Sequence, residues 1–223
     1  MKTLLRLGRY LEILDKLPVD QEYVSSGELA QLAGVTPSTV RQDFHAFPEL
    51  NGVSKRGYEI ASFKKDLAQV LGLDRETQLV VIGAGRVGQA IVGHPEFRKI
   101  NIHFRAFFDC NPELVGKVIE GVPVYSIDGL RDFLARNAAI KIAMLAVPAE
   151  AAEGVMAVIR DSGIRAVWNF CPVILESGDR LLVESESVGQ SLFKLIYNLN
   201  QKLKQEEATG DLMVCVGSAC HHK

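Results

Sequence analysis

The segment VVIGAGRVGQAIVG, residues 80–93, constrains the fold of this chain more than any other. An apolar run ends in Gly83-x-Gly85-x-x-Gly88 and is followed by residues that favour a helix. A strand, a glycine-rich turn and a helix in this order are typical of a dinucleotide-binding βαβ unit. In such a unit Gly83 permits the tight turn, Gly85 lets a pyrophosphate approach the backbone, and Gly88 allows close helix–strand packing.

A second apolar segment, HFRAFFD, ends in Asp109, about twenty residues further on. A carboxylate at this place accepts hydrogen bonds from both ribose hydroxyls and repels a 2′-phosphate, so NAD+ or NADH is the expected ligand. Arg86 either lies over the pyrophosphate or points into solvent. The predicted loop site consists of Gly83, Ala84, Gly85, Arg86, Val87, Gly88 and Asp109.

Strand-like and helix-like segments continue to alternate after Asp109. This alternation predicts an α/β fold, a doubly wound parallel sheet of the Rossmann type, whose ligand lies beyond the carboxyl ends of the strands. Turns at residues 147–149 and 169–172 are therefore candidate neighbours of the cofactor, although each also fits an ordinary proline-containing turn. The candidate residues are Val147, Pro148, Asn169 and Phe170.

The first 73 residues contain a pattern that a simple dehydrogenase does not need. In SSGELAQLAGVTPSTVRQDF, Ser25 and Glu28 have capping-box spacing, and Thr36 with Pro37 marks the start of a second helix. A short turn at Gly34 separates the two segments, which together predict a helix-turn-helix. The N-terminal region is therefore expected to be a DNA-binding domain, or else a helical cap that packs on the second domain.

Hydrogen-bonding residues lie near the start of the second predicted helix, where a helix-turn-helix contacts base edges. After it, LNGVSKRGYEI combines an Asn-Gly turn with a basic pair and an alternating Tyr58-Glu59-Ile60 strand, which predicts the wing of a winged helix. The DNA-contact candidates are Ser38, Thr39, Arg41 and Gln42 on the helix, and Lys55 and Arg56 on the wing.

Composition excludes several classes of protein. A formal charge of -2 over 223 residues is incompatible with a broadly basic nucleic-acid binder, although it permits a small basic face. An apolar run long enough to cross a membrane is not found, and Arg6 and Arg9 interrupt the apolar N-terminus before it could form a signal peptide. We therefore expect a cytoplasmic protein with no membrane partner.

The sequence predicts no catalytic residues. Hydride transfer needs a proton donor or acceptor beside the nicotinamide, often His or Lys, and none of the five histidines lies in the later strand-end turns. The chain is therefore expected to read the dinucleotide as a signal and not to be an enzyme. A nucleotide-binding dehydrogenase with a structural cap is a further possibility.

Five segments, taken together and in their order along the chain, resemble the Rex family of redox-sensing transcriptional repressors. They are SSGELAQLAGVTPSTVRQDF, VIGAGRVGQAIV, AFFDCNPELVGKVIEGVPVY, AVPAEAA and IRAVWNFCPV. The resemblance implies a homodimer that binds palindromic operator DNA when NAD+ predominates and releases it when NADH binds. It also implies a final helix that swaps across the dimer. The expected division is residues 1–73 (winged helix), 74–186 (Rossmann domain), 187–207 (swapped helix) and 208–223 (tail).

Several positions match the family pattern and others depart from it. Arg41 and Asp43 match its recognition segment, whereas Gln42 replaces a lysine. A tyrosine that usually follows the glycine-loop helix is His94 here, and an aspartate that usually opens the swapped helix is Ser187. The resemblance implies that these two positions take part in the switch between cofactor states, so we expect a weaker response to NADH than is usual in the family.

The tail contains Cys215-x4-Cys220, which resembles the first half of the cluster motif of thioredoxin-like [2Fe-2S] ferredoxins. Such a cluster takes four thiolates, so the native chain is longer, two tails share a cluster, or the match is incidental. A zinc site that adds His221 and His222 is a cramped alternative. The alternative function is thus an NADH-binding redox or electron-transfer regulator fused to an iron–sulfur module, with weak or lost switching on DNA.

Overall fold

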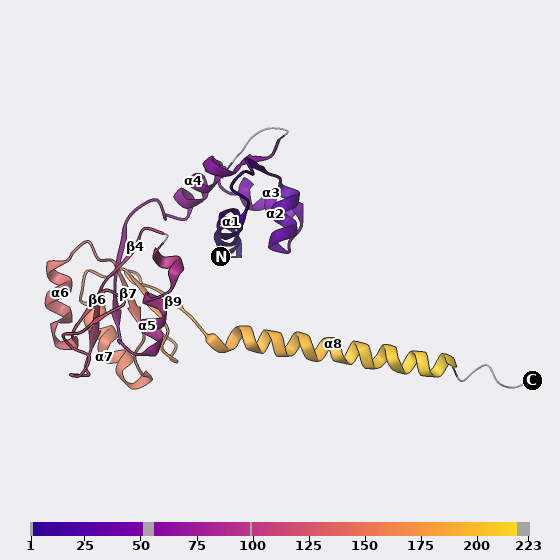
Figure 1. Cartoon of the computed structure of the whole chain (residues 1–223). Coiled ribbons are helices and arrows are strands. Elements are labelled where there is room, and N and C mark those ends of the chain that lie inside the picture. The colour runs from indigo at the N-terminus through magenta and orange to yellow at the C-terminus, as the bar shows by residue number, and fades with distance from the viewer. Residues whose placement is uncertain (1, 51–55, 99, 218–223) are drawn as a thin grey trace, which may run out of the picture.

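The computed structural model describes residues 2–50, 56–98 and 100–217, with side chains described as far as residue 206. Figure 1 shows a small N-terminal domain, a larger domain built on a central sheet, and a long C-terminal helix. Lys55 of the predicted wing and Cys220 of the predicted cluster motif lie outside the described residues.

The N-terminal domain is a helix-turn-helix with a small two-stranded sheet. Ser25 accepts a hydrogen bond from the Glu28 backbone, and Thr36 accepts one from the Thr39 backbone, so both predicted N-caps are confirmed. Gly34 adopts a φ of 68° in the turn between the two helices, which favours glycine. The elements are α1 (Lys2–Lys16), β1 (Tyr23–Val24), α2 (Ser26–Ala33), α3 (Pro37–His45), η1 (Pro48–Leu50), β2 (Tyr58–Glu59) and α4 (Ile60–Val70).

The wing strand is shorter than the sequence pattern predicts. β2 pairs antiparallel with β1 over two residues, and Ile60, predicted as the third strand residue, instead begins α4. The Ile60 backbone N–H still donates to the carbonyl of Glu22, so the chain leaves the ladder and enters the helix at this residue. Phe44 of α3 lies in the core between β2 and α4, and its ring meets Tyr58 and Phe63 edge-on.

The second domain is a seven-stranded sheet in the order β5-β6-β4-β3-β7-β8-β9, parallel except for the β5–β6 pair. From β6 to β9 this is the strand order of a Rossmann fold, in which the chain direction across the sheet reverses between β3 and β7. The strands are β3 (Thr77–Ile82), β4 (Ile102–Asp109), β5 (Val118–Ile119), β6 (Val122–Ser126), β7 (Ile142–Leu145), β8 (Ala166–Asn169) and β9 (Leu182–Ser185).

Helices pack on both faces of the sheet, to which the side chains of each strand point alternately. Val80 and Ile82 pack in the cluster that includes α6 and α7, whereas Val81 packs with Phe107 in the other cluster, which includes Val92 of α5. The covering elements are α5 (Arg86–Val92), η2 (Pro95–Arg98), η3 (Ile127–Gly129), α6 (Leu130–Arg136) and α7 (Ala149–Arg160).

The C-terminal helix α8 (Val188–Gly217) is longer than predicted. We expected a swapped helix over residues 187–207 and a separate tail from residue 208, but the helical backbone continues to Gly217 and includes Cys215. In Figure 1, α8 extends away from the sheet domain. Among the described residues, no helix is both long and apolar enough to cross a membrane.

Candidate cofactor crevice and DNA-reading surface

The three glycines of the loop after β3 have three different local environments. Gly83 has a φ of 101°, and a Cβ at this position would lie 2.3 Å from the Ala146 carbonyl oxygen. A Cβ on Gly88 would lie 2.4 Å from the Gly83 carbonyl oxygen, so α5 packs directly on the loop. A Cβ on Gly85 would meet no other atom within 4 Å. Gly83 and Gly88 are therefore required by packing, whereas Gly85 leaves room for a ligand at the backbone.

Asp109 closes the crevice at the end of β4. Its Oδ2 accepts a hydrogen bond of 2.7 Å from the Ala84 backbone N–H, and its Oδ1 accepts one of 2.8 Å from Asn111. A carboxylate has about four lone-pair sites, so each oxygen keeps capacity for a ribose hydroxyl. Asp109 thus joins the glycine loop to the ribose side of the predicted site.

Gln89 is a loop-shaping residue that the sequence analysis missed. Its side-chain amide lies one turn into α5 and donates a 2.7 Å hydrogen bond back to the Ala84 carbonyl. Arg86 and Val87, in the first turn of the same helix, are exposed. The exposed Arg86 side chain is compatible with both of its predicted orientations.

The turn after β7 contacts the glycine loop. Ala146 donates its backbone N–H to Ile82, and a Cβ on Gly83 would lie 3.2 Å from the Val147 side chain. Val147 is half-buried and Pro148 is exposed. The structure therefore places this turn directly beside the glycine loop, at the reversal of strand order.

The turn after β8 is held by the side chain of Asn169, which is fully buried. Its Nδ2 donates to the Val173 carbonyl and to Ser185 Oγ, both at 3.1 Å, and its Oδ1 accepts from the Cys171 backbone at 2.9 Å. Both amide N–H groups are thus engaged within the protein. Asn169 shapes the turn, and Phe170 is the half-buried side chain that follows it.

Cys171 follows Phe170 and is buried. Burial raises the pKa of the Cys171 thiol, and a backbone hydrogen bond from Val147 offsets this only in part. The thiol is therefore held neutral and unreactive near pH 7.

The outer face of α3 presents the predicted DNA-contact residues. Ser38, Arg41 and Gln42 are exposed, whereas Thr39 is half-buried and within 2.9 Å of the Thr36 hydroxyl. The Arg41 guanidinium donates a 3.4 Å hydrogen bond to the hydroxyl of Ser26, the first residue of α2. The sequence analysis did not single out Ser26, because its partner Arg41 is 15 positions away in the chain.

Arg56, the described residue of the basic wing pair, is exposed beside β2. Lys55 is outside the described residues, so its predicted role is not tested. The six DNA-contact candidates remain predictions. The structure brings four of them together on α3.

Asp43 of the recognition segment points into the protein and is 2% exposed. It accepts hydrogen bonds from Arg6 Nε at 2.6 Å, from Arg6 Nη2 at 2.5 Å and from the Tyr10 hydroxyl at 2.9 Å. Burial acts to raise the pKa of Asp43, but the hydrogen bonds from Arg6 and Tyr10 outweigh it and lower the pKa. Burial, with the bond to Asp43, raises the pKa of Tyr10 to about 12. Asp43 therefore attaches α3 to α1.

The Asp43→Asn variant is expected to lose about 2–4 kcal/mol of unfolding free energy at pH 7, because a partly buried Arg6 loses its counter-charge. The folded pKa of Asp43 is below its unfolded value of about 3.9, so the contribution of its carboxylate is present above that pH and falls below it. Urea unfolding at pH 7 and pH 3 should show the difference between wild type and variant narrowing at pH 3. The exposed Asp20→Asn is the control, and an equal loss at both pH values would contradict the assignment.

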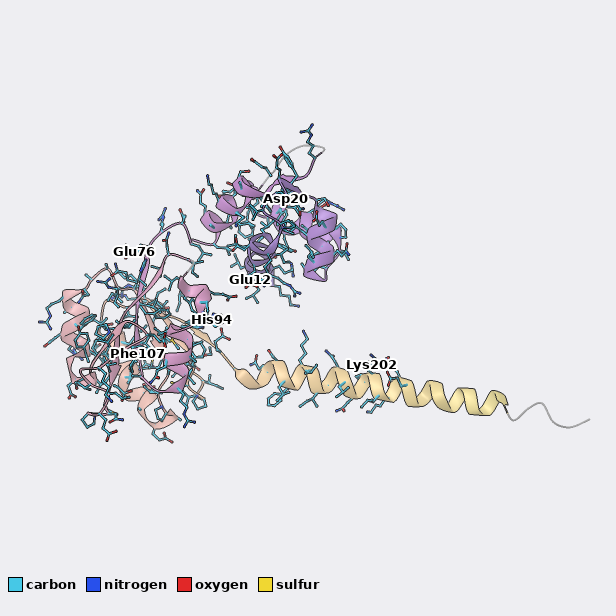
Figure 2. All side chains as sticks on the ribbon, viewed as in Figure 1. Glu12, Asp20, Glu76, His94, Phe107 and Lys202 are labelled. Carbon is cyan, nitrogen blue, oxygen red and sulfur yellow. The ribbon has the colours of Figure 1, made fainter. Side chains whose placement is uncertain are left out.

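The two positions that depart from the family pattern lie at different places in the chain. His94 follows α5, is exposed, and lies in Figure 2 on the side of the sheet domain nearest to the N-terminal domain in that view. Its ring is 6.0 Å from that of Phe97. Ser187 lies between β9 and α8, and its carbonyl accepts the backbone N–H of Gln190.

The described residues contain no group of three or more His, Cys, Asp or Glu side chains placed to hold a metal ion. The side chain of Cys215 and all of Cys220 are outside that description. The iron–sulfur and zinc predictions for the tail therefore remain untested.

A helix-turn-helix domain with a two-stranded sheet, joined to a Rossmann domain whose glycine loop lies beside Asp109, is the arrangement of a DNA-binding regulator that responds to a nucleotide. Two family models match the chain, one described as a CoA binding domain over residues 74–173 and one as "Putative DNA-binding protein N-terminus" over residues 1–45.

Curated and solved relatives cover nearly the whole chain. The redox-sensing transcriptional repressor Rex of Thermoanaerobacter sp. (strain X514) is 37% identical over 217 residues, which are 95% of this chain and 96% of the relative. Rex of Clostridioides difficile (strain 630) is 37% identical over 202 residues, 90% of this chain and 95% of the relative. The chain belongs to the Rex family of redox-sensing transcriptional repressors.

Two crystal structures of the Rex-family repressor RSP are similar to the fold described above. RSP in complex with β-NADH is 35% identical, with a TM-score of 0.83 over 93% of this chain and 97% of that chain. RSP in complex with β-NAD+ and operator DNA is also 35% identical, with a TM-score of 0.83 over 94% and 96%. The relatives are thus named as repressors rather than as enzymes.

Proposed function

We propose that this protein is a transcriptional repressor that senses the ratio of NADH to NAD+ and binds palindromic operator DNA in the cytoplasm. One observation carries the proposal: an exposed reading face on α3, with Arg41 at its centre, belongs to the same chain as a glycine cradle closed by Asp109. The relative RSP has been crystallised with both ligands, NADH in one complex and NAD+ with operator DNA in another.

The residues of the crevice fit a dinucleotide. The open backbone at Gly85 accommodates the pyrophosphate beside the first N–H groups of α5, and Asp109 accepts the ribose hydroxyls. When bound, the nicotinamide supplies a ring whose charge differs between NAD+ and NADH. The turns after β7 and β8, with Val147, Pro148 and Phe170, are proposed to line the nicotinamide end.

We propose that the dinucleotide is a signal and not a substrate, so that the protein is not an enzyme. Val147, Pro148 and Phe170 have no side chain that transfers protons, and both amide N–H groups of Asn169 are engaged. The neighbouring Cys171 thiol is held neutral by burial. These crevice residues therefore offer no general acid or base beside the nicotinamide.

The C-terminal helix is proposed to complete a homodimer. The apolar side chains of α8 occupy roughly half of the helix circumference, at about 100° per residue, and an apolar face this broad is normally buried against other protein surface. The exposed apolar residues of α8 are Leu192, Phe193, Leu195, Ile196, Tyr197, Leu199 and Leu203.

Two apolar surfaces of the same chain are suited to receive the partner's helix. One is a groove on the outside of α1 that includes Leu4, Leu5 and Leu32, and the other crosses the sheet domain and includes Phe97 and Phe104. The second groove has a volume of about 500 Å³. We therefore propose the division into a winged-helix domain (1–73), a Rossmann domain (74–186) and a swapped helix (187–207).

Switching requires that the two nucleotide states favour different dimer arrangements, because a ligand with equal affinity for both shifts nothing. A full reversal between mostly DNA-competent and mostly released dimers needs up to about 5.5 kcal/mol of differential binding. Two recognition helices related by a two-fold axis contact half-sites about 34–36 Å apart, or a multiple of that distance.

Fluorescence anisotropy of a labelled palindromic duplex, titrated with protein in the presence of NAD+ or NADH, tests the proposal. We expect tight binding with NAD+ and weaker binding with NADH. Equal operator affinity with both nucleotides would exclude redox sensing, and binding no tighter than to a scrambled duplex would exclude the repressor function.

Asp109→Ala is expected to weaken NADH binding by about 1–3 kcal/mol, roughly 5- to 150-fold, because charge-assisted hydrogen bonds to the ribose are lost. Isothermal titration calorimetry on the isolated protein measures this directly. The exposed Asp179→Ala is the matched control for loss of a carboxylate. Unchanged affinity in Asp109→Ala would remove the ribose assignment.

A further inference from the structure

Trp168 of β8 contacts three parts of the molecule. Its ring packs against Phe170 with centroids 4.7 Å apart, and against Phe97 at 5.9 Å. Its indole Nε1–H donates a 3.2 Å hydrogen bond to the carboxylate of Glu186. Because residues two apart in a strand lie on the same face of a sheet, Phe170 extends the face of Trp168 to the carboxyl edge, where the crevice lies.

Glu186 is held at the point where the chain leaves the sheet for α8. Its backbone N–H donates a 2.8 Å hydrogen bond to the Asn169 carbonyl, and its carboxylate accepts from Trp168. Ser187 follows, and α8 begins at Val188. The backbone bond and the side-chain bond of Glu186 together set the direction in which the helix starts.

The aromatic contacts also reach His94. The Phe97 ring is 6.0 Å from that of His94 and 5.7 Å from that of Phe104. A continuous series of contacts therefore runs from His94 through Phe97 and Trp168 to Glu186, the neighbour of Ser187. Trp168 therefore connects His94, through Phe97, with Glu186, the residue next to Ser187.

We propose that Trp168 is a positioning residue that couples the nicotinamide end of the crevice to α8. A displacement of Phe170 by the bound dinucleotide moves the packed indole, and the Trp168–Glu186 hydrogen bond transmits that movement to the start of the helix. This inference rests on the proposed function, since Phe170 must lie beside the nicotinamide.

Because α8 is long, a small change in its direction at Glu186 produces a large displacement of its far end. A helix of 30 residues is about 45 Å long, so a rotation of about 5° at its start moves its far end by about 4 Å. The contacts of the Trp168 ring with Phe170 and Phe97 are the path along which such a movement is transmitted. The indole has a single N–H donor, so its bond to Glu186 either persists or breaks.

Three substitutions separate the hydrogen bond from the packing. Trp168→Phe keeps an aromatic ring but removes the donor, and Glu186→Met removes the acceptor at similar size. Glu186→Gln keeps an oxygen acceptor and is the matched control. For each variant, anisotropy gives the ratio of operator affinities with NAD+ and with NADH, and calorimetry gives the NADH affinity.

In the wild type we expect that ratio to lie in the usual range for coupled sites, roughly 5- to 150-fold. Trp168→Phe and Glu186→Met should bring the ratio to within about twofold of one, with NADH affinity changed by less than about twofold. Glu186→Gln should keep the wild-type ratio. A wild-type ratio in Trp168→Phe and Glu186→Met would overturn the proposal.

Trp168 is the only tryptophan of the chain, so its emission reports this contact directly, without DNA. NAD+, which does not absorb indole emission, should shift the emission maximum of the wild type, Glu186→Gln and Glu186→Met alike, because the displacement of Phe170 acts on the indole before the hydrogen bond transmits the movement. A wild type whose emission maximum does not change when NAD+ binds would overturn the coupling. A wild type that binds no operator but shows the shift would instead refute the repressor function and support the contact.

Discussion

Arg41→Ala should remove sequence-specific operator binding and leave NADH binding unchanged. Arg41 is exposed on α3 and is positioned by Ser26, and a bidentate contact of an arginine with a base is worth about 1–3 kcal/mol. A dimer loses two such contacts, about 2–6 kcal/mol, which is a loss of roughly 30- to 10⁴-fold in affinity.

Anisotropy with the operator duplex and calorimetry with NADH measure the two effects separately. Arg136→Ala is the matched control, because Arg136 is also an exposed arginine on a helix but belongs to α6 of the sheet domain. Operator affinity within about twofold of wild type for Arg41→Ala would show that α3 is not the reading helix.

Gly83→Ala should abolish dinucleotide binding and destabilise the sheet domain. At a φ of 101° a side chain is strained, and the added Cβ would lie 2.3 Å from the Ala146 carbonyl oxygen, which belongs to the backbone of the opposite turn. The loop and the β7 turn must separate, which we expect to reduce the unfolding free energy by about 2–4 kcal/mol.

Urea unfolding and NADH calorimetry test this result. Gly154→Ala is the control, because Gly154 lies in α7 with open space around its Cβ position and an ordinary helical backbone. That control should be stabilised by up to about 1 kcal/mol, since alanine is the better helix former. Wild-type stability and NADH affinity in Gly83→Ala would show that the loop has more space than the structure gives it.

The helix-turn-helix and the dinucleotide loop are predictable from the sequence because local rules determine them. Ser25 and Thr36 cap helices through bonds to residues three positions away, and the glycine spacing defines a turn within a few residues. The doubly wound sheet follows from alternation of strands and helices, and its strand order places Asp109 beside the loop.

Long-range contacts were not predictable in the same way. Asp43 resembles a surface residue of a recognition helix, yet its partner Arg6 is 37 positions away in sequence. The hydrogen bond between Trp168 and Glu186 spans 18 positions, and neither residue belongs to a local motif. The end of α8 was also predicted too early, because the residues after 207, Gly210 among them, do not interrupt the helical backbone.

The sequence by itself therefore determined the helix-turn-helix and the alternating strands and helices, the ligand class predicted for the glycine loop and Asp109, and the helix that is the candidate to read DNA. Only the tertiary structure decided which side chains face inward and which elements they join. The physical reason is that caps, turns and glycine spacing act over a few residues, whereas a buried ion pair or an aromatic contact exists only after distant segments have packed together.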